Sequence, residues 1–155
     1  MSSNTYYLKV AAWGGVILLH FRIAHWFTKG KRKYIGFLYL VYYHLVIRHI
    51  LSCDIHENTT IGENLCIWHC FGIAINPATV IGNNVTIGHN TTLGKNRGKS
   101  PIIEDNVSIS PGCSIIGGVR IGACSTIGIG SVVIKDVEPY SVVAGNPAKI
   151  IRKKL

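Results

Sequence analysis

The sequence of 155 residues predicts a mainly β protein, a parallel β-helix of hexapeptide repeats preceded by N-terminal α-helices. Aliphatic residues recur every six positions through the second half of the chain. The first half lacks this repeat and contains two long apolar runs instead. Hydrophobic residues make up 48% of the sequence and charged residues 15%, so the chain has ample apolar surface to bury in one domain.

The helical half contains no acidic residue before position 54. The runs Val10 to Phe27 and Tyr34 to Leu51 predict two helices, joined by the basic segment Lys29 to Lys33. Each run could span a bilayer in length, but Arg22 interrupts the first and Arg48 the second. Because a charge at mid-bilayer depth costs roughly 2.5 kcal/mol or more, we expect these helices to pack against the protein or a sister subunit. Peripheral contact with an anionic membrane surface is the alternative.

The aliphatic repeat carries the fold prediction for the second half. It shifts by two residues between Ile73 and Ile75 and is interrupted at Gly94 to Pro101. Every position of the repeat is Ile, Leu or Val: Ile55, Ile61, Ile67, Ile73, Ile75, Ile81, Ile87, Leu93, Ile103, Ile109, Ile115, Ile121, Ile127 and Val133. Six is not a multiple of 3.6, so one helix face cannot produce this spacing. A parallel β-helix can, because each hexad then forms one short strand and one corner.

Other positions of the hexad agree with this fold. A small or β-branched residue, which suits a narrow interior, recurs at Val85, Thr91, Val107, Cys113, Val119, Ser125 and Ser131. Gly or Asn at the corners would permit the left-handed backbone conformation. We therefore predict a helical segment at 1–52, a β-helix at 53–138 with a loop at 94–101, and a C-terminal tail at 139–155.

Several segments resemble one enzyme family. They are Arg22 to Trp26, Cys53 to His56, Ile67 to Asn76, Val85 to Gly94 and Pro139 to Lys149. Together with the hexads, they resemble the left-handed β-helix acyltransferases, in the serine acetyltransferase-like branch. The resemblance implies the left-handed sense of the coil and an enzyme that transfers acetyl from acetyl-CoA to a hydroxyl.

Three differences from the serine enzymes bear on the identity of the acceptor. Trp68 stands where the serine enzymes carry an Asp before the catalytic His, and Ser100 stands where they carry a second His. The chain also lacks their large N-terminal helical domain. These departures favour a relative of the colanic acid type, an O-acetyltransferase that acts on a sugar in surface polysaccharide or exopolysaccharide biosynthesis. Serine O-acetyltransferase of cysteine biosynthesis is the alternative.

His69 is the candidate general base, because an imidazole can take the hydroxyl proton and return it to the leaving thiol. It lies where the hexad count slips, and such bulges often re-aim functional side chains. Asp54 precedes it by about one coil, and the resemblance implies that Asp54 orients the imidazole. His89 is a competing base. The substrate-lining candidates are Trp68, Phe71, His89 and Asn90.

Acetyl-CoA is the expected co-substrate, and its phosphates call for a basic site. The formal charge of +9 and the interrupted hexad, with Lys95, Arg97 and Lys99, fit this requirement. The resemblance further implies backbone contacts to the pantetheine near Lys95, Pro111, Gly117 and Ile129. No nucleic-acid motif accompanies the positive charge.

The resemblance also implies a homotrimer with its sites between subunits. A metal-binding β-helix of the γ-carbonic anhydrase type, using His56, His69 and His89, is an alternative from another class. Otherwise no metal is expected. The five cysteines include no Cys-x-x-Cys pair and are expected to be free thiols in a reducing cytosol. No convincing secretory signal is present, so a cytoplasmic location, at the inner face of the membrane if the helices contact lipid, is expected.

Overall fold

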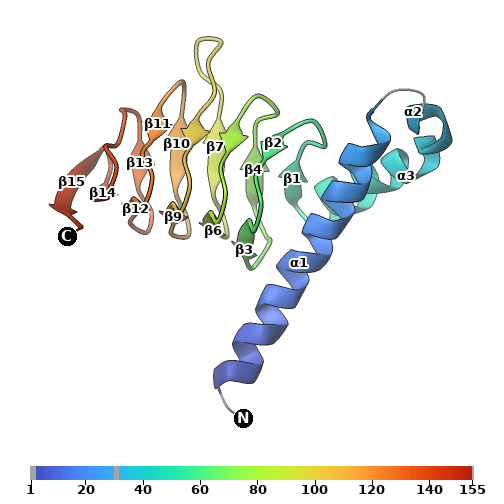
Figure 1. The fold of residues 1–155 in the computed structure, drawn as a ribbon, viewed down its shortest axis with the longest axis horizontal. Coiled ribbons are helices and arrows are strands. Elements are labelled where there is room, and N and C mark those ends of the chain that lie inside the picture. Colours follow the sequence, from blue (N-terminus) through green and yellow to red (C-terminus); the bar gives the residue numbers. More distant parts are fainter. Residues whose placement is uncertain (1–2, 30–31, 155) are drawn as a thin grey trace.

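The computed structural model describes residues 3–29 and 32–154, and it shows a β-helix with helices at one end (Figure 1). The strands fall into three sheets, which form the walls of a three-sided prism. Strands three places apart in the chain are parallel neighbours, as in the pairs β1 with β4 and β3 with β6. The prediction of a mainly β protein with a parallel β-helix and N-terminal helices is confirmed.

The sheets are named here A, B and C in the order in which the chain enters them. Sheet A contains β1 (Cys53–Ile55), β4 (Ile73–Ile75), β7 (Thr92–Gly94), β10 (Ser114–Ile116) and β13 (Val132–Val133). Sheet B contains β2 (Thr60–Ile61), β5 (Val80–Ile81), β8 (Ile102–Ile103) and β11 (Arg120–Ile121). Sheet C contains β3 (Cys66–Trp68), β6 (Thr86–Gly88), β9 (Ser108–Ile109), β12 (Thr126–Ile127), β14 (Ser141–Gly145) and β15 (Ala148–Lys153). The pair β14 and β15 is antiparallel and ends sheet C.

The interior of the prism is a set of aliphatic ladders. Every predicted aliphatic position is at most 8% exposed, and the small interior positions are buried as well. Ile87, for example, pairs in register with Ile67 on one side and Ile109 on the other. Asn64, Asn84 and Asn106 have φ angles of 54°, 54° and 59° at one corner, which confirms the left-handed corner conformation.

The helical half consists of α1 (Ser3–Phe27), α2 (Arg32–Ile35), α3 (Phe37–Tyr42) and the π-helix η1 (Tyr43–Ile50). The first predicted helix is present and begins earlier than expected, whereas the second is divided into three pieces. Gly36 separates α2 from α3, where an added Cβ would lie 2.2 Å from a ring carbon of Phe27. Hydropathy does not encode this close approach, so the sequence pattern could not show the break.

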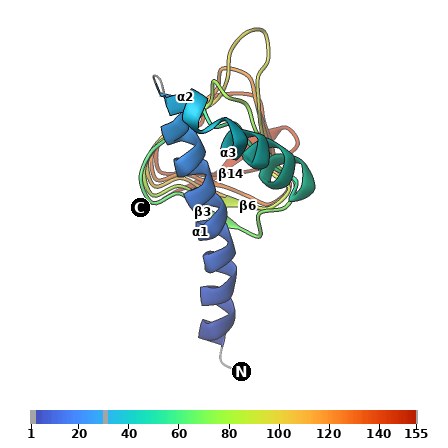
Figure 2. The ribbon, with the colours of Figure 1, turned by 90° about the vertical axis from the view of Figure 1, so that its right-hand side faces the viewer.

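The helices cover the first coil of the β-helix. Phe21 and Ala24 of α1, with Tyr43 and Ile47 of η1, are buried in one core with the interior of the prism. The first half of α1 extends beyond the β-helix, as both views show (Figures 1 and 2). Among the described residues, no helix has the length and apolar character required to cross a membrane. Packing against the rest of the protein was the expected role of these helices, and the buried face agrees with it.

Candidate active site

The corner between β3 and β4 differs from those that follow it. Ile67 pairs with Ile87 and Ile75 pairs with Leu93, so this corner is two residues longer than the same corner one coil later. His69 lies in the extra segment and has a φ angle of 52°. Asn90 has a φ angle of 53° one coil later, so the left-handed conformation is the ordinary corner conformation of this prism. The two extra residues are therefore what distinguishes the His69 corner.

His69 opens onto a hollow of about 370 Å³ on the outer side of sheet C. Its lining residues are Trp68, His69, Thr86, Gly88, His89, Ser108, Ile109, Ser110 and Pro111. The rings of His69 and His89 meet edge to face, with centroids 5.7 Å apart. The Nδ1 atom of His89 is buried without a hydrogen-bond partner within the described structure. The hollow therefore offers two imidazoles, one of them with an unsatisfied nitrogen.

The predicted site residues divide between two edges of the prism. Along the edge between sheets C and A, backbone N–H groups of Asn90, Gly112 and Gly130 donate to the carbonyls of the preceding coil. These acceptors belong to Phe71, His89 and Pro111, which with Ile129 form one column. Three predicted substrate residues (Phe71, His89 and Asn90) and two predicted cofactor residues (Pro111 and Ile129) therefore share the edge that carries His69.

The remaining predicted cofactor residues occupy the edge between sheets A and B. The loop after β7 contains Lys95, Arg97 and Lys99 and projects from the prism, drawn yellow in Figure 1. Arg97, Lys99, Gly117 and Lys135 border a hollow of about 470 Å³. Within one chain this basic hollow lies across sheet A from His69, so the structure does not bring the two predicted groups together.

Asp54 lies on the outer face of sheet A and contacts Arg48 rather than His69. Its Oδ1 accepts a hydrogen bond from Nε of Arg48 at 2.6 Å, and Nη2 of the same guanidinium lies 2.6 Å from this oxygen as an ion pair. No hydrogen bond joins Asp54 to His69 in the part of the chain that the structure describes. The two residues of the predicted catalytic pair are therefore not hydrogen-bonded to each other.

Arg48 and its neighbours form a polar cluster that the sequence analysis missed. The buried Glu57 carboxylate lies 3.3 Å from Nε2 of His44, 3.6 Å from Nδ1 of His56 and 4.0 Å from Nη1 of Arg48. Hydropathy shows these residues as isolated charges, and only folding places η1 against β1. His56 contacts Glu57 and His44, whereas the ring of His69 contacts that of His89. No group of three or more metal-ligating side chains suited to a metal ion occurs among the described residues.

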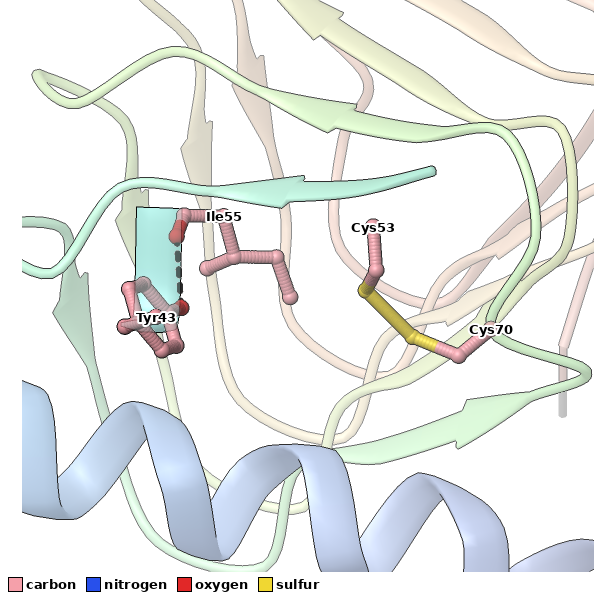
Figure 3. Close-up of a disulfide and its surroundings, with 4 residues drawn as sticks. All are labelled: Tyr43, Cys53, Ile55 and Cys70. Carbon is pink, nitrogen blue, oxygen red and sulfur yellow. Dashed lines mark hydrogen bonds between the residues drawn. A yellow bond between two sulfur atoms is a disulfide. The ribbon is translucent and has the colours of Figure 1, made fainter. Parts of the chain in front are cut away.

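The cysteines near the site correct one expectation. Cys53 and Cys70, whose Cα atoms are 5.9 Å apart, are joined by a disulfide, so they are not free thiols (Figure 3). Their spacing in the sequence resembles no motif, because consecutive coils bring them together. Cys66 is free, and burial raises the pKa of its thiol, which disfavours the nucleophilic thiolate.

Comparison with known proteins identifies the family. The serine acetyltransferase of Bacillus subtilis is 35% identical over 156 residues, which cover 97% of this chain and 70% of that protein. The chain belongs to the serine acetyltransferase family. The enzyme of Buchnera aphidicola is 37% identical over 138 residues, and the match covers 51% of its length. Across the curated relatives it matches, the chain spans between 34% and 70% of their length. No protein-family model matches the chain.

Solved structures give the same result. Serine acetyltransferase from Neisseria gonorrhoeae has a TM-score of 0.81 and 34% identity, covering 92% of this chain and 56% of that one. A serine acetyltransferase in complex with CoA has a TM-score of 0.75 and 30% identity, covering 87% and 55%. This match confirms the left-handed β-helix of the acyltransferases.

The predicted sugar acceptor is wrong. The relatives found by sequence and by structure are named serine acetyltransferases, not polysaccharide O-acetyltransferases of the colanic acid type. The prediction gave decisive weight to Trp68, Ser100 and the length of the N-terminal segment. Similarity over nearly the whole chain outweighs these local differences. The sequence alternative, serine acetyltransferase, is the better supported one.

Proposed function

We propose that the chain transfers the acetyl group of acetyl-CoA to the hydroxyl of serine. Membership of the serine acetyltransferase family supports this activity. A solved relative binds CoA and another, from Neisseria gonorrhoeae, binds serine. The observation that carries the proposal is His69, held in a left-handed conformation at the longer corner and open to a hollow.

The chemistry requires one base and no covalent enzyme intermediate. As the serine oxygen forms its bond to the acetyl carbon, Nδ1 or Nε2 of His69 accepts the hydroxyl proton. The carbon–sulfur bond of the thioester then breaks, and the imidazolium returns its proton to the CoA sulfur. Free imidazole titrates near neutral pH, so it suits both proton transfers. His89 and Trp68 share the hollow and would line the acceptor, and Asn90 follows His89 in the chain.

Asp54 is proposed to orient His69 and stabilise the imidazolium. Cys53 precedes Asp54 and Cys70 follows His69, so the disulfide holds the two backbones side by side. The proposal requires the carboxylate to reach the ring in the substrate complex, and catalytic hydrogen bonds often tighten only when substrate is bound. This role of Asp54 requires no covalent acyl-enzyme intermediate.

Acetyl-CoA is proposed to use both edges of the prism. The column of Pro111 and Ile129 beside His69 suits the pantetheine, because it exposes backbone and apolar surface. The basic loop with Lys95, Arg97 and Lys99, near Gly117, suits the phosphates. In one chain these surfaces are separated by sheet A.

A homotrimer would resolve that separation, and we propose this assembly. Prisms packed side by side about a threefold axis set the His69 edge of one chain against the basic loop of the next. Sedimentation equilibrium should give the mass of three chains, and a monomer at assay concentration would exclude the arrangement. Mixing His69→Ala with Arg97→Ala subunits should restore activity, because a mixed trimer contains one intact site.

The helical half is proposed to contact an anionic membrane surface. Its exposed apolar side chains include Leu19 and Trp26 of α1 and Phe37 and Leu38 of α3. No acidic residue occurs before Asp54, so the helical half carries no negative side chain that would repel lipid phosphates. The protein should co-sediment with vesicles containing phosphatidylserine and not with phosphatidylcholine vesicles. The cytoplasmic location expected from the sequence stays a prediction.

The activity is tested by replacing His69 with Ala. Release of CoA from acetyl-CoA should depend on L-serine in the wild type and fall about 10²- to 10⁴-fold in kcat in the variant. His20→Ala is the matched control, because His20 hydrogen-bonds Tyr39 in the helical half and should be dispensable. Turnover by His69→Ala equal to that of His20→Ala would exclude His69 as the base. Absence of serine-dependent turnover in the wild type would exclude serine as the acceptor.

A further inference from the structure

We infer that Arg48 is a positioning residue for Asp54, an inference that rests on the proposed role of Asp54 beside His69. Two guanidinium nitrogens of Arg48, Nε and Nη2, each lie 2.6 Å from the same oxygen, Oδ1 of Asp54. The Asp54 side chain is 53% exposed, and exposed ion pairs contribute little to stability. One charge-assisted hydrogen bond from Nε, with Nη2 of the same rigid guanidinium equally close to Oδ1, does, however, fix the direction of the carboxylate.

Arg48 is itself held on its other side. Its side chain is only 17% exposed, and its Nη1 donates to Nδ1 of His44 at 2.7 Å. Because this nitrogen of His44 accepts, the ring proton lies on Nε2, which faces Glu57 at 3.3 Å. Glu57 is buried and lies 4.0 Å from the guanidinium. Arg48 is thus fixed between a buried carboxylate and an exposed one.

The helix that carries Arg48 is anchored to the strand that carries Asp54. The hydroxyl of Tyr43, the first residue of η1, donates to the carbonyl of Ile55 at 2.7 Å (Figure 3). Tyr43 is fully buried, so this contact sets the register of η1 against β1. π-helical segments are rare and occur frequently at functional sites. In this chain η1 places the guanidinium of Arg48 beside the carboxylate of Asp54.

The backbone of Asp54 lies close to that of the His69 corner. The residue before Asp54 and the residue after His69 are joined by the Cys53–Cys70 disulfide, with Cα atoms 5.9 Å apart. With Oδ1 engaged by Arg48, Oδ2 is the oxygen available to an imidazole nitrogen. Arg48 therefore sets which oxygen is presented, and at what angle, without touching the substrate.

The decisive variant is Arg48→Lys, which keeps a positive charge beside Glu57 but cannot place two donors on one oxygen. We expect kcat to fall about tenfold with the KM for acetyl-CoA unchanged, the size of effect seen when an orienting partner is removed. Asp54→Asn should lower kcat further, and the double variant Arg48→Lys/Asp54→Asn should equal Asp54→Asn alone. A double variant that shows the product of the two single effects would overturn the inference.

A second readout does not require turnover. The imidazole NMR resonances of His69 at a fixed pH should move in Asp54→Asn, because the ring then loses its carboxylate partner. Arg48→Lys changes no net charge and does not alter the ring itself, so the same movement in that variant would report a misdirected carboxylate. The His69→Ala spectrum identifies the resonances, and His89 serves as a neighbouring reference. Resonances of His69 that keep their wild-type positions in Arg48→Lys would contradict the inference.

The control is Arg120→Ala, which removes a comparable exposed pair with Glu104 on sheet B. It should leave kcat and the His69 resonances unchanged, and thermal melting should show all variants folded. If the wild type does not acetylate serine, the proposed function fails, while the His69 resonances still decide the role of Arg48. If the wild type is active and Arg48→Lys matches it in both readouts, only the positioning role fails.

Discussion

The β-helix and the helical half are built by opposite rules. In the β-helix each coil repeats the one before it, so Ile87 lies between Ile67 and Ile109 in a continuous ladder. The described part of the helical half has no such repeat, and its buried residues Phe21, Ala24, Tyr43 and Ile47 join the core of the prism at the first coil. The repeated half therefore derives its stability from a local pattern, whereas the helical half depends on one surface.

The candidate site lies where this regularity ends. His69 occupies a corner with two residues more than the next, and Asp54 is on the coil that the helices cover. Regular coils offer aliphatic residues inside and short polar residues outside, which gives little catalytic chemistry. The proposed site thus lies at the junction of the two halves, and the following experiments test the contrast between them.

The largest effect is expected inside the ladders. Ile109→Ala removes a side chain that is 1% exposed and should lower the free energy of unfolding by roughly 2–5 kcal/mol, through lost burial and a cavity. Leu38→Ala on α3, where the side chain is 80% exposed, should change it by less than about 0.5 kcal/mol. Urea unfolding followed by circular dichroism measures both. Equal losses would show that the helical half buries Leu38 in the assembly.

An intermediate effect is expected at the boundary of the two halves. The Cys53–Cys70 disulfide closes a loop with a sequence separation of 17, for which loop-closure entropy predicts about 3 kcal/mol. Cys53→Ser should lower the free energy of unfolding by about that amount, and dithiothreitol should do the same to the wild type but not to the variant. Thiol labelling in denaturant without reductant should find three reactive thiols, and five would show that the disulfide is absent.

The smallest effect is expected on the outer face of the regular coils. Hydrogen bonds from Arg120 and from the backbone N–H of Ala123 hold the pKa of Glu104 below its ordinary value of 4.5. A lowered pKa means that the ionised form adds stability above about pH 4.5, and that this is lost as the pH falls through the folded value. Glu104→Gln should cost less than about 1 kcal/mol at pH 7.

The same substitution should cost less at about pH 3 than at pH 7, because the wild-type carboxyl is more protonated at the lower pH. Urea unfolding at both values of pH gives the comparison. A constant difference between wild type and Glu104→Gln would mean that charge at this position does not contribute. The outer faces would then matter only through the shape of the coils.

The sequence by itself determined the β-helix, its interior and the position of His69. A six-residue repeat is local information: each Ile, Leu or Val faces inward because of its place in its own hexad, so Ile55 to Val133 could be assigned without any long-range contact. The slip between Ile73 and Ile75 likewise marked the longer corner. The acceptor was assigned wrongly, since Trp68 and Ser100 are single positions whose effect depends on what surrounds them.

Only the tertiary structure decided the contacts between distant parts of the chain. The disulfide, the division of the second helix at Gly36 and the hold of Arg48 on Asp54 each depend on how η1 and α1 meet the first coil. These contacts depend on direction and distance, which a pattern of residue types does not encode. In the hexapeptide repeat, each residue's neighbours follow from its place in the hexad. The junction between the helices and the first coil depends instead on the fit of two different surfaces, which meet only in the folded chain.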